Sequence, residues 1–314
     1  MALKKVDIAI CAYGKPYHTA VSLLSLLDHS GAHIDKIYFQ EEKSQPFDSD
    51  FSFIKSHVTD ADIIHYVPSM HHGWHPNDSN RLSEEGYRTS IRYQYAWENT
   101  DKNYLFILHN DCRFSHDIIG DMLSKLDGSD YTGVGPIGQC WNCPAHHAGV
   151  CDGSRYESYT PSYEDVCDLI AKHPSPRISP DTVDRQQPMP LPECRLNEFY
   201  CLINISKVRD VVSPKGEVPP IGMMGLDTGV DWFRQLVLRG HRFLNWYDHT
   251  IHGWTNASNG GHQSNTDAEL YKKMEETAKS CFLEKWGRGN CRGTPAISSH
   301  QSAPPLPCNA PLSP

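Results

Sequence analysis

The chain has no apolar stretch that could cross a membrane, since none approaches the roughly 18 consecutive apolar residues that a spanning helix needs. Basic character is also scarce. The formal net charge is -9, and no basic run is longer than the lysine pairs at 4–5 and 272–273, which argues against a nucleic-acid or anionic-membrane partner. The N-terminal residues enter a strand pattern without the apolar core of a signal peptide. We therefore expect a cytoplasmic protein.

Disulfides are not expected in that compartment, although the sequence has 11 cysteines. A C-x₂-C pair and further cysteines in an irregular segment predict a closed structural Zn²⁺ site of four thiolates. Its expected ligands are Cys140, Cys143, Cys151 and Cys194. His146 or His147 is an alternative ligand, and unliganded thiols packed in loops are the alternative to a zinc site. Such a site would hold an insertion that lacks an apolar core of its own.

Strand and helix patterns alternate along most of the chain. Strands are predicted at 6–12, 34–39, 63–67, 104–108, 199–205 and 243–246, and helices at 17–29, 84–98, 163–172, 230–239 and 266–287. The regular pattern fades from Gly133 to about Pro192. This alternation predicts an α/β fold with a mostly parallel sheet covered by helices on both faces.

The most informative stretch is 104–111, where a continuous apolar run ends in His-Asn-Asp. Such a run is typical of a strand buried on both faces of a parallel sheet. Ligands of open α/β sheets bind outside the carboxyl ends of these strands, so Asp111 would lie where such folds bind their ligands. A carboxylate there can hold a divalent metal, which in turn holds phosphates. A helix-like segment follows at 115–123, and the alternative is that Asp111 caps this helix.

The order of motifs resembles the GT-A-fold glycosyltransferases of the family 2 type, over roughly residues 5–125 and 198–262. The resemblance rests on the turn at 12–16, acidic residues after the second strand, and an Asp-x-Asp-like motif at 109–111. It also rests on an acidic segment at 225–231, Arg-Gly-His at 239–241, and a late histidine in the segment 248–254. The first acid of the Asp-x-Asp motif is replaced by His109, and the later Glu-Asp motif reads Leu-Asp.

The resemblance implies a metal-dependent, inverting transfer of a sugar from a nucleotide-sugar donor, expected to be a UDP-sugar, to a hydroxyl of a glycan or small acceptor. The residues that it places at the nucleotide are Ala12, Tyr13, Gly14, Pro16, Glu41, Arg88 and Asn110. Arg92 is an equal candidate to Arg88 for the phosphates. Asp111 and His252 would hold Mn²⁺ or Mg²⁺, of which Mn²⁺ accepts imidazole ligands more readily.

Asp227 and Asp231 are the candidates for the base that deprotonates the acceptor. Thr228 and Gly229 indicate that a helix begins after Asp227, which would leave Asp227 in a loop facing the cleft. Asp231 would then lie in the first turn, where an acid stabilises the helix dipole without a catalytic role. We therefore favour Asp227.

The resemblance implies a single GT-A-like domain, 1–291, with a nucleotide-binding half (1–132), the cysteine-rich insertion (133–197) and an acceptor half (198–291). The Pro/Ser-rich composition of residues 292–314 predicts a disordered tail. Two other functions stay open. The missing first acid favours a catalytically degraded GT-A-like domain that binds a glycan or a partner. A nucleotidyltransferase on a similar sheet would have a glycine-rich first loop, of which only Gly14 and Lys15 are present.

Overall fold

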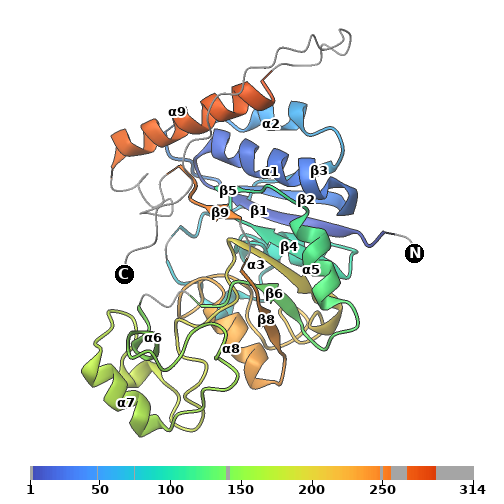
Figure 1. Ribbon diagram of the computed structural model, residues 1–314. Coiled ribbons are helices and arrows are strands. Elements are labelled where there is room, and N and C mark those ends of the chain that lie inside the picture. Colours follow the sequence, from blue (N-terminus) through green and yellow to red (C-terminus); the bar gives the residue numbers. More distant parts are fainter. Residues whose placement is uncertain are drawn as a thin grey trace.

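The computed structural model describes residues 3–47, 49–73, 75–138, 142–247, 250–255 and 267–287. Seven strands form one sheet in the order β3-β2-β1-β4-β7-β6-β8 (Figure 1). Their bounds are β1 Val6–Ala12, β2 Ile34–Glu41, β3 Asp62–Tyr66, β4 Tyr104–Leu108, β6 Gly133–Gly135, β7 Tyr200–Asn204 and β8 Phe243–Asn245. Two further strands, β5 Cys112–Arg113 and β9 Ile251–His252, pair with each other.

The sheet is mixed but mostly parallel. Strands β3, β2, β1 and β4 are parallel neighbours, and β6 pairs in parallel with β8. Strand β7 is antiparallel to both β4 and β6, so it alone runs against the other six. The predicted α/β class is confirmed. The start of β7 consequently lies at the same edge of the sheet as the carboxyl ends of β1, β2 and β4.

Helices cover both faces of this sheet (Figure 1). Their bounds are α1 Pro16–Ser30, α2 Ser52–His57, α3 Glu85–Arg88, α4 Gln94–Asn99, α5 Ile118–Leu126, α6 Pro144–His147, α7 Tyr163–Lys172, α8 Val230–Leu238 and α9 Ala268–Lys285. Helices α1, α2, α5 and α9 contribute to the core on one face. Helices α4 and α8 contribute to the core on the other face. Successive residues of β1 alternate between these cores, as a strand buried on both faces requires.

One predicted helix is wrong. The segment 84–98 forms the two short helices α3 and α4, because Tyr93 adopts a left-handed conformation with φ of 66°. The hydroxyls of Thr89 and Ser90 also donate to the carbonyls of Glu85 and Gly86, at 2.8 and 2.7 Å, at the end of α3. Side-chain bonds of this kind compete with helix continuation. The helix predicted at 163–172 is confirmed as α7, which a Ser162–Asp165 capping box begins.

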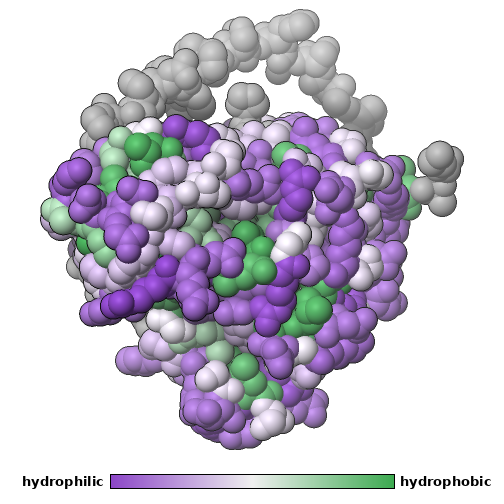
Figure 2. Space-filling model, turned by 90° about the horizontal axis from the view of Figure 1, so that it is seen from below, coloured by the Kyte–Doolittle hydropathy of each residue, from purple (hydrophilic) through white to green (hydrophobic). Residues whose placement is uncertain are grey.

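The expectation that the insertion lacks an apolar core is also wrong. A small separate core holds it together, formed by Cys143, Ala145, Cys151, Val166, Ile178, Val183 and Leu191. In Figure 1 the yellow-green helices α6 and α7 lie at the lower left, away from the sheet. The longest described helix, α9, has 18 residues and many charged side chains, and no helix in the described ranges is long and apolar enough to span a membrane. The face seen in Figure 2 is mainly hydrophilic, with small separate hydrophobic patches.

Candidate active site

The candidate site begins where the chain leaves β4, because His109-Asn110-Asp111 follows Leu108 directly. The short sheet of β5 and β9 then brings a distant histidine to this point. Its register pairs Cys112 with His252, and the N–H of Gly253 donates to the carbonyl of Asp111 at 3.0 Å. A segment about 140 residues further along the chain is therefore fixed beside Asp111 by backbone pairing.

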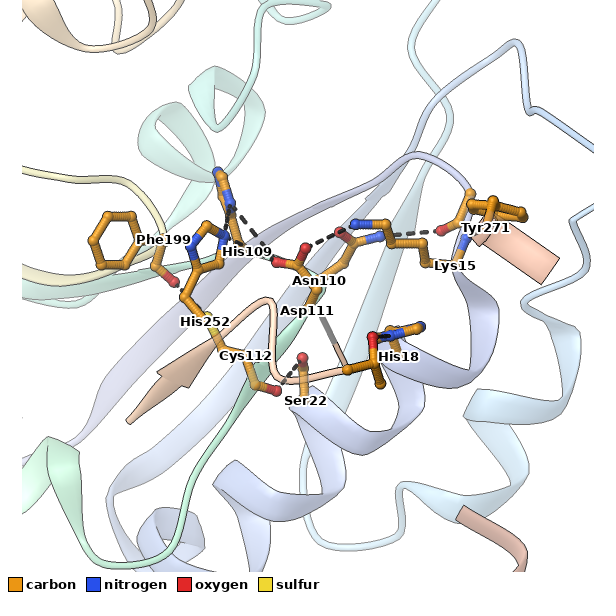
Figure 3. A network of polar contacts seen from close by, with 12 residues as sticks. Lys15, His18, Ser22, His109, Asn110, Asp111, Cys112, Phe199, His252 and Tyr271 are labelled. Carbon is orange, nitrogen blue, oxygen red and sulfur yellow. Dashed lines mark hydrogen bonds and ion pairs between the residues drawn. The ribbon is translucent and has the colours of Figure 1, made fainter. Parts of the chain in front are cut away.

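Three side chains converge there. Nε2 of His252 lies 3.2 Å from Oδ1 of Asp111 and 3.2 Å from Nδ1 of His109 (Figure 3). The third distance, from His109 Nδ1 to Asp111 Oδ1, is 4.0 Å. Asp111 is 3% exposed, and its Oδ1 makes no hydrogen bond of good geometry within the described residues. Two imidazole nitrogens around an unsatisfied carboxylate oxygen fit a divalent cation.

The other oxygen of Asp111, Oδ2, forms an ion pair with Lys15. Nζ of Lys15 donates to Oδ2 at 2.8 Å, and both side chains are buried. Lys15 has a left-handed backbone with φ of 57°, and its N–H donates to the hydroxyl of Tyr271 on α9 at 2.7 Å (Figure 3). Burial raises the pKa of Asp111, but Lys15 and His252 oppose it and hold the pKa well below its usual range. Asp111 is therefore a carboxylate at neutral pH.

The turn after β1 is tied to the same site. Asn110 donates to the carbonyl of Gly14 at 3.0 Å, and the Gly14 N–H donates to Gln45 at 2.7 Å. Ala12 ends β1 and Pro16 begins α1, so these predicted nucleotide residues lie together with Asn110 around the turn. Gly14 has φ of +61°, and a Cβ there would lie 2.8 Å from Pro46. Only glycine fits that position without strain.

Tyr13 belongs to this turn, and the acidic residues at the end of β2 lie beside it, since Glu41 pairs with Ala12. The Tyr13 ring stacks with His71 at 5.6 Å between centroids. The predicted Glu41 accepts from His65 at 2.8 Å and is partly exposed, whereas the next residue, Glu42, is buried and accepts from His71 at 3.0 Å. A small cavity is lined by Glu42, His71, His72, Gly73, His75, Asn77, Ser90, Arg92, Gly222, Met223 and Thr228.

The two arginine candidates differ in position. Arg88 donates to both oxygens of Glu98, at 2.7 and 2.9 Å, and to the carbonyl of Leu82. It does not line the cavity. Arg92 does line it, and Glu42 and Glu198 are among the charges that act on its guanidinium. The structure therefore places Arg92, rather than Arg88, at the cavity.

The base candidates lie beside α8, as predicted, with Asp227 before the helix and Asp231 in its first turn. Asp227 contacts Arg177 and lies 3.2 Å from Nη1 of Arg195. Burial raises the pKa of Asp227, but Arg195, the Thr228 N–H and Arg177 lower it below its usual value. Asp231 accepts the N–H groups of residues 225 and 226, both at 2.9 Å, which is a structural role.

Sequence reasoning did not assign functional roles to four of these residues. Lys15 and His109 belong to the motifs at 12–16 and 109–111, but the motif pattern indicates only a missing acid at His109. No sequence motif points to Glu198 or Arg195. Burial raises the pKa of Glu198, but Arg195 and His109 lower it to about 2, so it is ionised. The signal for His109 was its spacing, because side chains two apart at a strand end point to the same side.

The cysteines do not support a zinc site in the part of the chain that the structure describes. Cys143 and Cys151 belong to the small core of the insertion, whereas Cys194 packs against the α4–α8 core. Cys140 lies outside the described residues. Two described groups have metal-ligand spacing, and neither contains a cysteine. The zinc site stays a prediction, which metal analysis of purified protein would test.

The second group of metal-ligand spacing is formed by Asp7, Asp35 and Asp101. Nζ of Lys102 already lies 2.6 Å from Asp35 and 2.7 Å from Asp101. Thr100 donates to Asp7 at 2.6 Å. These carboxylates are therefore compensated by neighbouring donors, unlike Oδ1 of Asp111.

No protein-family model matches the chain, and no curated protein matches it. Among solved structures, the chain is similar to mouse xyloside xylosyltransferase 1 in its apo form, with 12% identity, a TM-score of 0.43, and coverage of 78% of this chain and 85% of that one. It is similar to the mannosyltransferase PcManGT of Pyrobaculum calidifontis, solved with GDP-Man and Mn²⁺, with 7% identity, a TM-score of 0.48, and coverage of 90% and 76%. For residues 1–349 of S. aureus TarS the identity is 9%, the TM-score 0.44, and the coverage 90% and 72%.

Proposed function

We propose that the chain is a metal-dependent glycosyltransferase of GT-A type, with an inverting mechanism, that moves a sugar from a nucleotide-sugar to a hydroxyl acceptor. The observation that carries this proposal is the cluster of His109, Asp111 and His252 at the carboxyl end of β4. A divalent cation held there would supply positive charge to a departing diphosphate. The ammonium of Lys15, on the other oxygen of Asp111, adds a second positive charge at the same place.

The donor's nucleotide is proposed to bind along the turn from Ala12 to Pro16. The cavity residues Glu42 and Arg92 support this assignment, because a carboxylate can accept from a base edge or a ribose hydroxyl and a guanidinium can pair with phosphate. Glu41 and Arg88 are bound to His65 and Glu98 in the structure, so they are weaker candidates. A uridine nucleotide remains our expectation for the donor.

Asp227 is proposed as the base because it lies in the loop before α8, beside Thr228 of the cavity. Its ion pairs with Arg177 and Arg195 favour the ionised form that a base needs. They also reduce its basicity, so the acceptor would have to displace at least one arginine before proton transfer. Asp231 is the less suitable base, since two backbone N–H groups already occupy one of its oxygens.

Thermal unfolding with UDP, GDP and ADP, each with and without Mn²⁺, tests the proposal. A ligand that binds only the folded state at 100 times its Kd stabilises by about 2.7 kcal/mol, which corresponds to a rise of several degrees in Tm. We expect such a rise for UDP with Mn²⁺. Asp111→Ala should abolish the Mn²⁺-dependent part, and Asp121→Asn, which changes an exposed carboxylate on α5, should leave it intact.

A response to no nucleotide, with or without Mn²⁺, would contradict the transferase. Two observations then favour a second function, a GT-A-like domain that binds a glycan or a partner without catalysis. The base candidate Asp227 is held by two arginines, and the first acid of the metal motif is a histidine. Glycan binding in the absence of nucleotide and of turnover would support this second function.

A further inference from the structure

The two residues that precede β7 lie against the candidate cation site. Because β7 is antiparallel to β4, Tyr200 pairs with Leu108 at the edge where β4 ends. The carbonyl of Phe199 accepts the N–H of His109 at 3.0 Å, which continues this pairing by one residue. Glu198 and Phe199 are thereby fixed beside the segment that carries His109 and Asp111.

The two ring nitrogens of His109 face different partners. Nδ1 points to the cluster, 3.2 Å from Nε2 of His252. Nε2 points away from it, 3.6 Å from Oε1 of Glu198. A carboxylate offers only acceptors, so the tautomer with a proton on Nε2 is favoured and Nδ1 keeps its lone pair for the cluster. This is the arrangement by which outer carboxylates orient metal-binding histidines.

Phe199 acts on the other imidazole. Its ring lies parallel to that of His252, with an interplanar angle of 7° and centroids 4.8 Å apart. In Figure 3 the Phe199 ring lies beside His252, on the side away from Asp111 and Lys15. A flat neighbour of this kind limits rotation of the imidazole and keeps Nε2 directed at Asp111.

The second carboxylate oxygen of Glu198 faces Arg195. Nε of Arg195 lies 3.6 Å from Oε2 of Glu198, and both side chains are buried. Arg195 is anchored by a bond from Nη1 to the carbonyl of Thr228 at 2.9 Å. Neither Arg195 Nε nor Glu198 Oε2 makes a hydrogen bond within the described residues, so the contact between them is electrostatic.

We propose that Glu198 and Phe199 are positioning residues of the cation site, Glu198 by fixing the tautomer of His109 and Phe199 by fixing the plane of His252. The inference rests on the proposed function, because it assigns the cluster to a divalent cation. Glu198 and Phe199 would each contact a histidine of the cluster, whose motif differs from Asp-x-Asp at His109.

The tautomer can be measured without metal. Nitrogen-15 NMR of the histidine-labelled protein, assigned with a His109→Gln variant, should show His109 protonated on Nε2. Glu198→Ala should shift the signal toward a mixture of tautomers, because the carboxylate that favours one form is removed. An Nδ1-protonated His109 in the unaltered protein would overturn the role of Glu198, whatever the activity of the protein proves to be.

Mn²⁺ titration of the nucleotide-free protein, followed by electron paramagnetic resonance, tests the consequence. Loss of an outer partner typically weakens metal affinity by about 10–100-fold, which we expect for Glu198→Ala. Glu198→Gln should lose less, because its amide oxygen can still face Nε2 of His109 as an acceptor. This variant also guards against misfolding of the alanine variant. Phe199→Leu should also weaken binding. Glu98→Gln, which breaks a Glu–Arg pair elsewhere, is the matched control and should bind Mn²⁺ normally.

The outcomes separate the two proposals. An unaltered protein that binds no Mn²⁺ contradicts the metal-dependent function. Normal Mn²⁺ binding by folded Glu198→Ala and Glu198→Gln overturns the role of Glu198, and normal binding by Phe199→Leu overturns that of Phe199. Weakened binding in both Glu198 variants, graded as described and absent from the control, supports the inference.

Discussion

Replacing Lys15 by methionine would remove the ammonium from Asp111 while keeping a side chain of similar length. The pair is 2.8 Å apart, and the two side chains are 7% and 4% exposed, so solvent does not screen it. Removing one partner of a buried pair costs about 3–5 kcal/mol, because the other charge stays buried. His252 remains 3.2 Å from the carboxylate and compensates it in part. We therefore expect a loss near the lower limit, about 3 kcal/mol, in metal-free protein.

Two further variants isolate the interaction. In Lys15→Met the charge on Asp111 is the source of the loss, so adding Asp111→Asn should recover part of it. The coupling energy of such a contacting pair is expected at about 0.5–3 kcal/mol. Saturating Mn²⁺ should also stabilise Lys15→Met more than the unaltered protein, because the cation replaces the positive charge that Asp111 has lost.

Urea unfolding followed by tryptophan fluorescence gives the free energies of unfolding. Lys36→Met is the matched control. Its ammonium lies 3.3 Å from Asp101, in a pair that is 28% and 63% exposed, and such surface pairs contribute about 0–1 kcal/mol. If Lys15→Met costs no more than Lys36→Met, the reasoning from burial is refuted.

Three other predictions follow from the site. Asp227→Asn should lower turnover by about 10²–10⁴-fold with little change in donor affinity, whereas Asp231→Asn should mainly lower stability; the reverse result would exchange their roles. Because the folded pKa of Asp227 lies below its usual 3.8, its ionised form stabilises the fold above that pH, and this stabilisation is lost as the pH falls further. The free energy of unfolding should therefore fall more between pH 5 and pH 2 in the unaltered protein than in Asp227→Asn. Gly14→Ala should destabilise by more than about 1 kcal/mol and weaken nucleotide binding, because its backbone is left-handed and the new Cβ would lie 2.8 Å from Pro46 and 2.9 Å from Tyr271; wild-type stability in urea would contradict this.

Most of the fold could be predicted because most buried strands are short apolar runs and the long helices have apolar spacing. Strand β6 could not be predicted, because Gly133–Gly135 is too short to form such a run. The direction of β7 could not be predicted. Its residues are buried on both faces, and such a run looks the same whether the strand is parallel or antiparallel. The antiparallel direction of β7 places Glu198 at the site. Because the sequence does not reveal that direction, it does not reveal Glu198 as a site residue either.

The same limit applies to the nucleotide side. Consecutive residues at the end of β2 point to opposite sides, so a one-residue difference separates Glu41, which meets His65, from Glu42, which lines the cavity. Asp111 and His252 were predicted from their motifs, and the β5–β9 pairing brings them together. Whether they bind a metal remains a prediction.

The charges around the cluster lead to a last expectation. Lys15, Arg177 and Arg195 carry three positive charges, and their ion-pair partners Asp111, Glu198 and Asp227 carry three negative charges. Histidines coordinate metals in their neutral form. These charges balance one another, so a divalent cation alone would add an excess of two positive charges in a buried place. A nucleoside diphosphate restores the balance. We expect UDP and Mn²⁺ to stabilise the protein together by more than the sum of their separate effects, with each raising the affinity of the other by the same factor. Thermal shifts that simply add would show that the two ligands do not share this site.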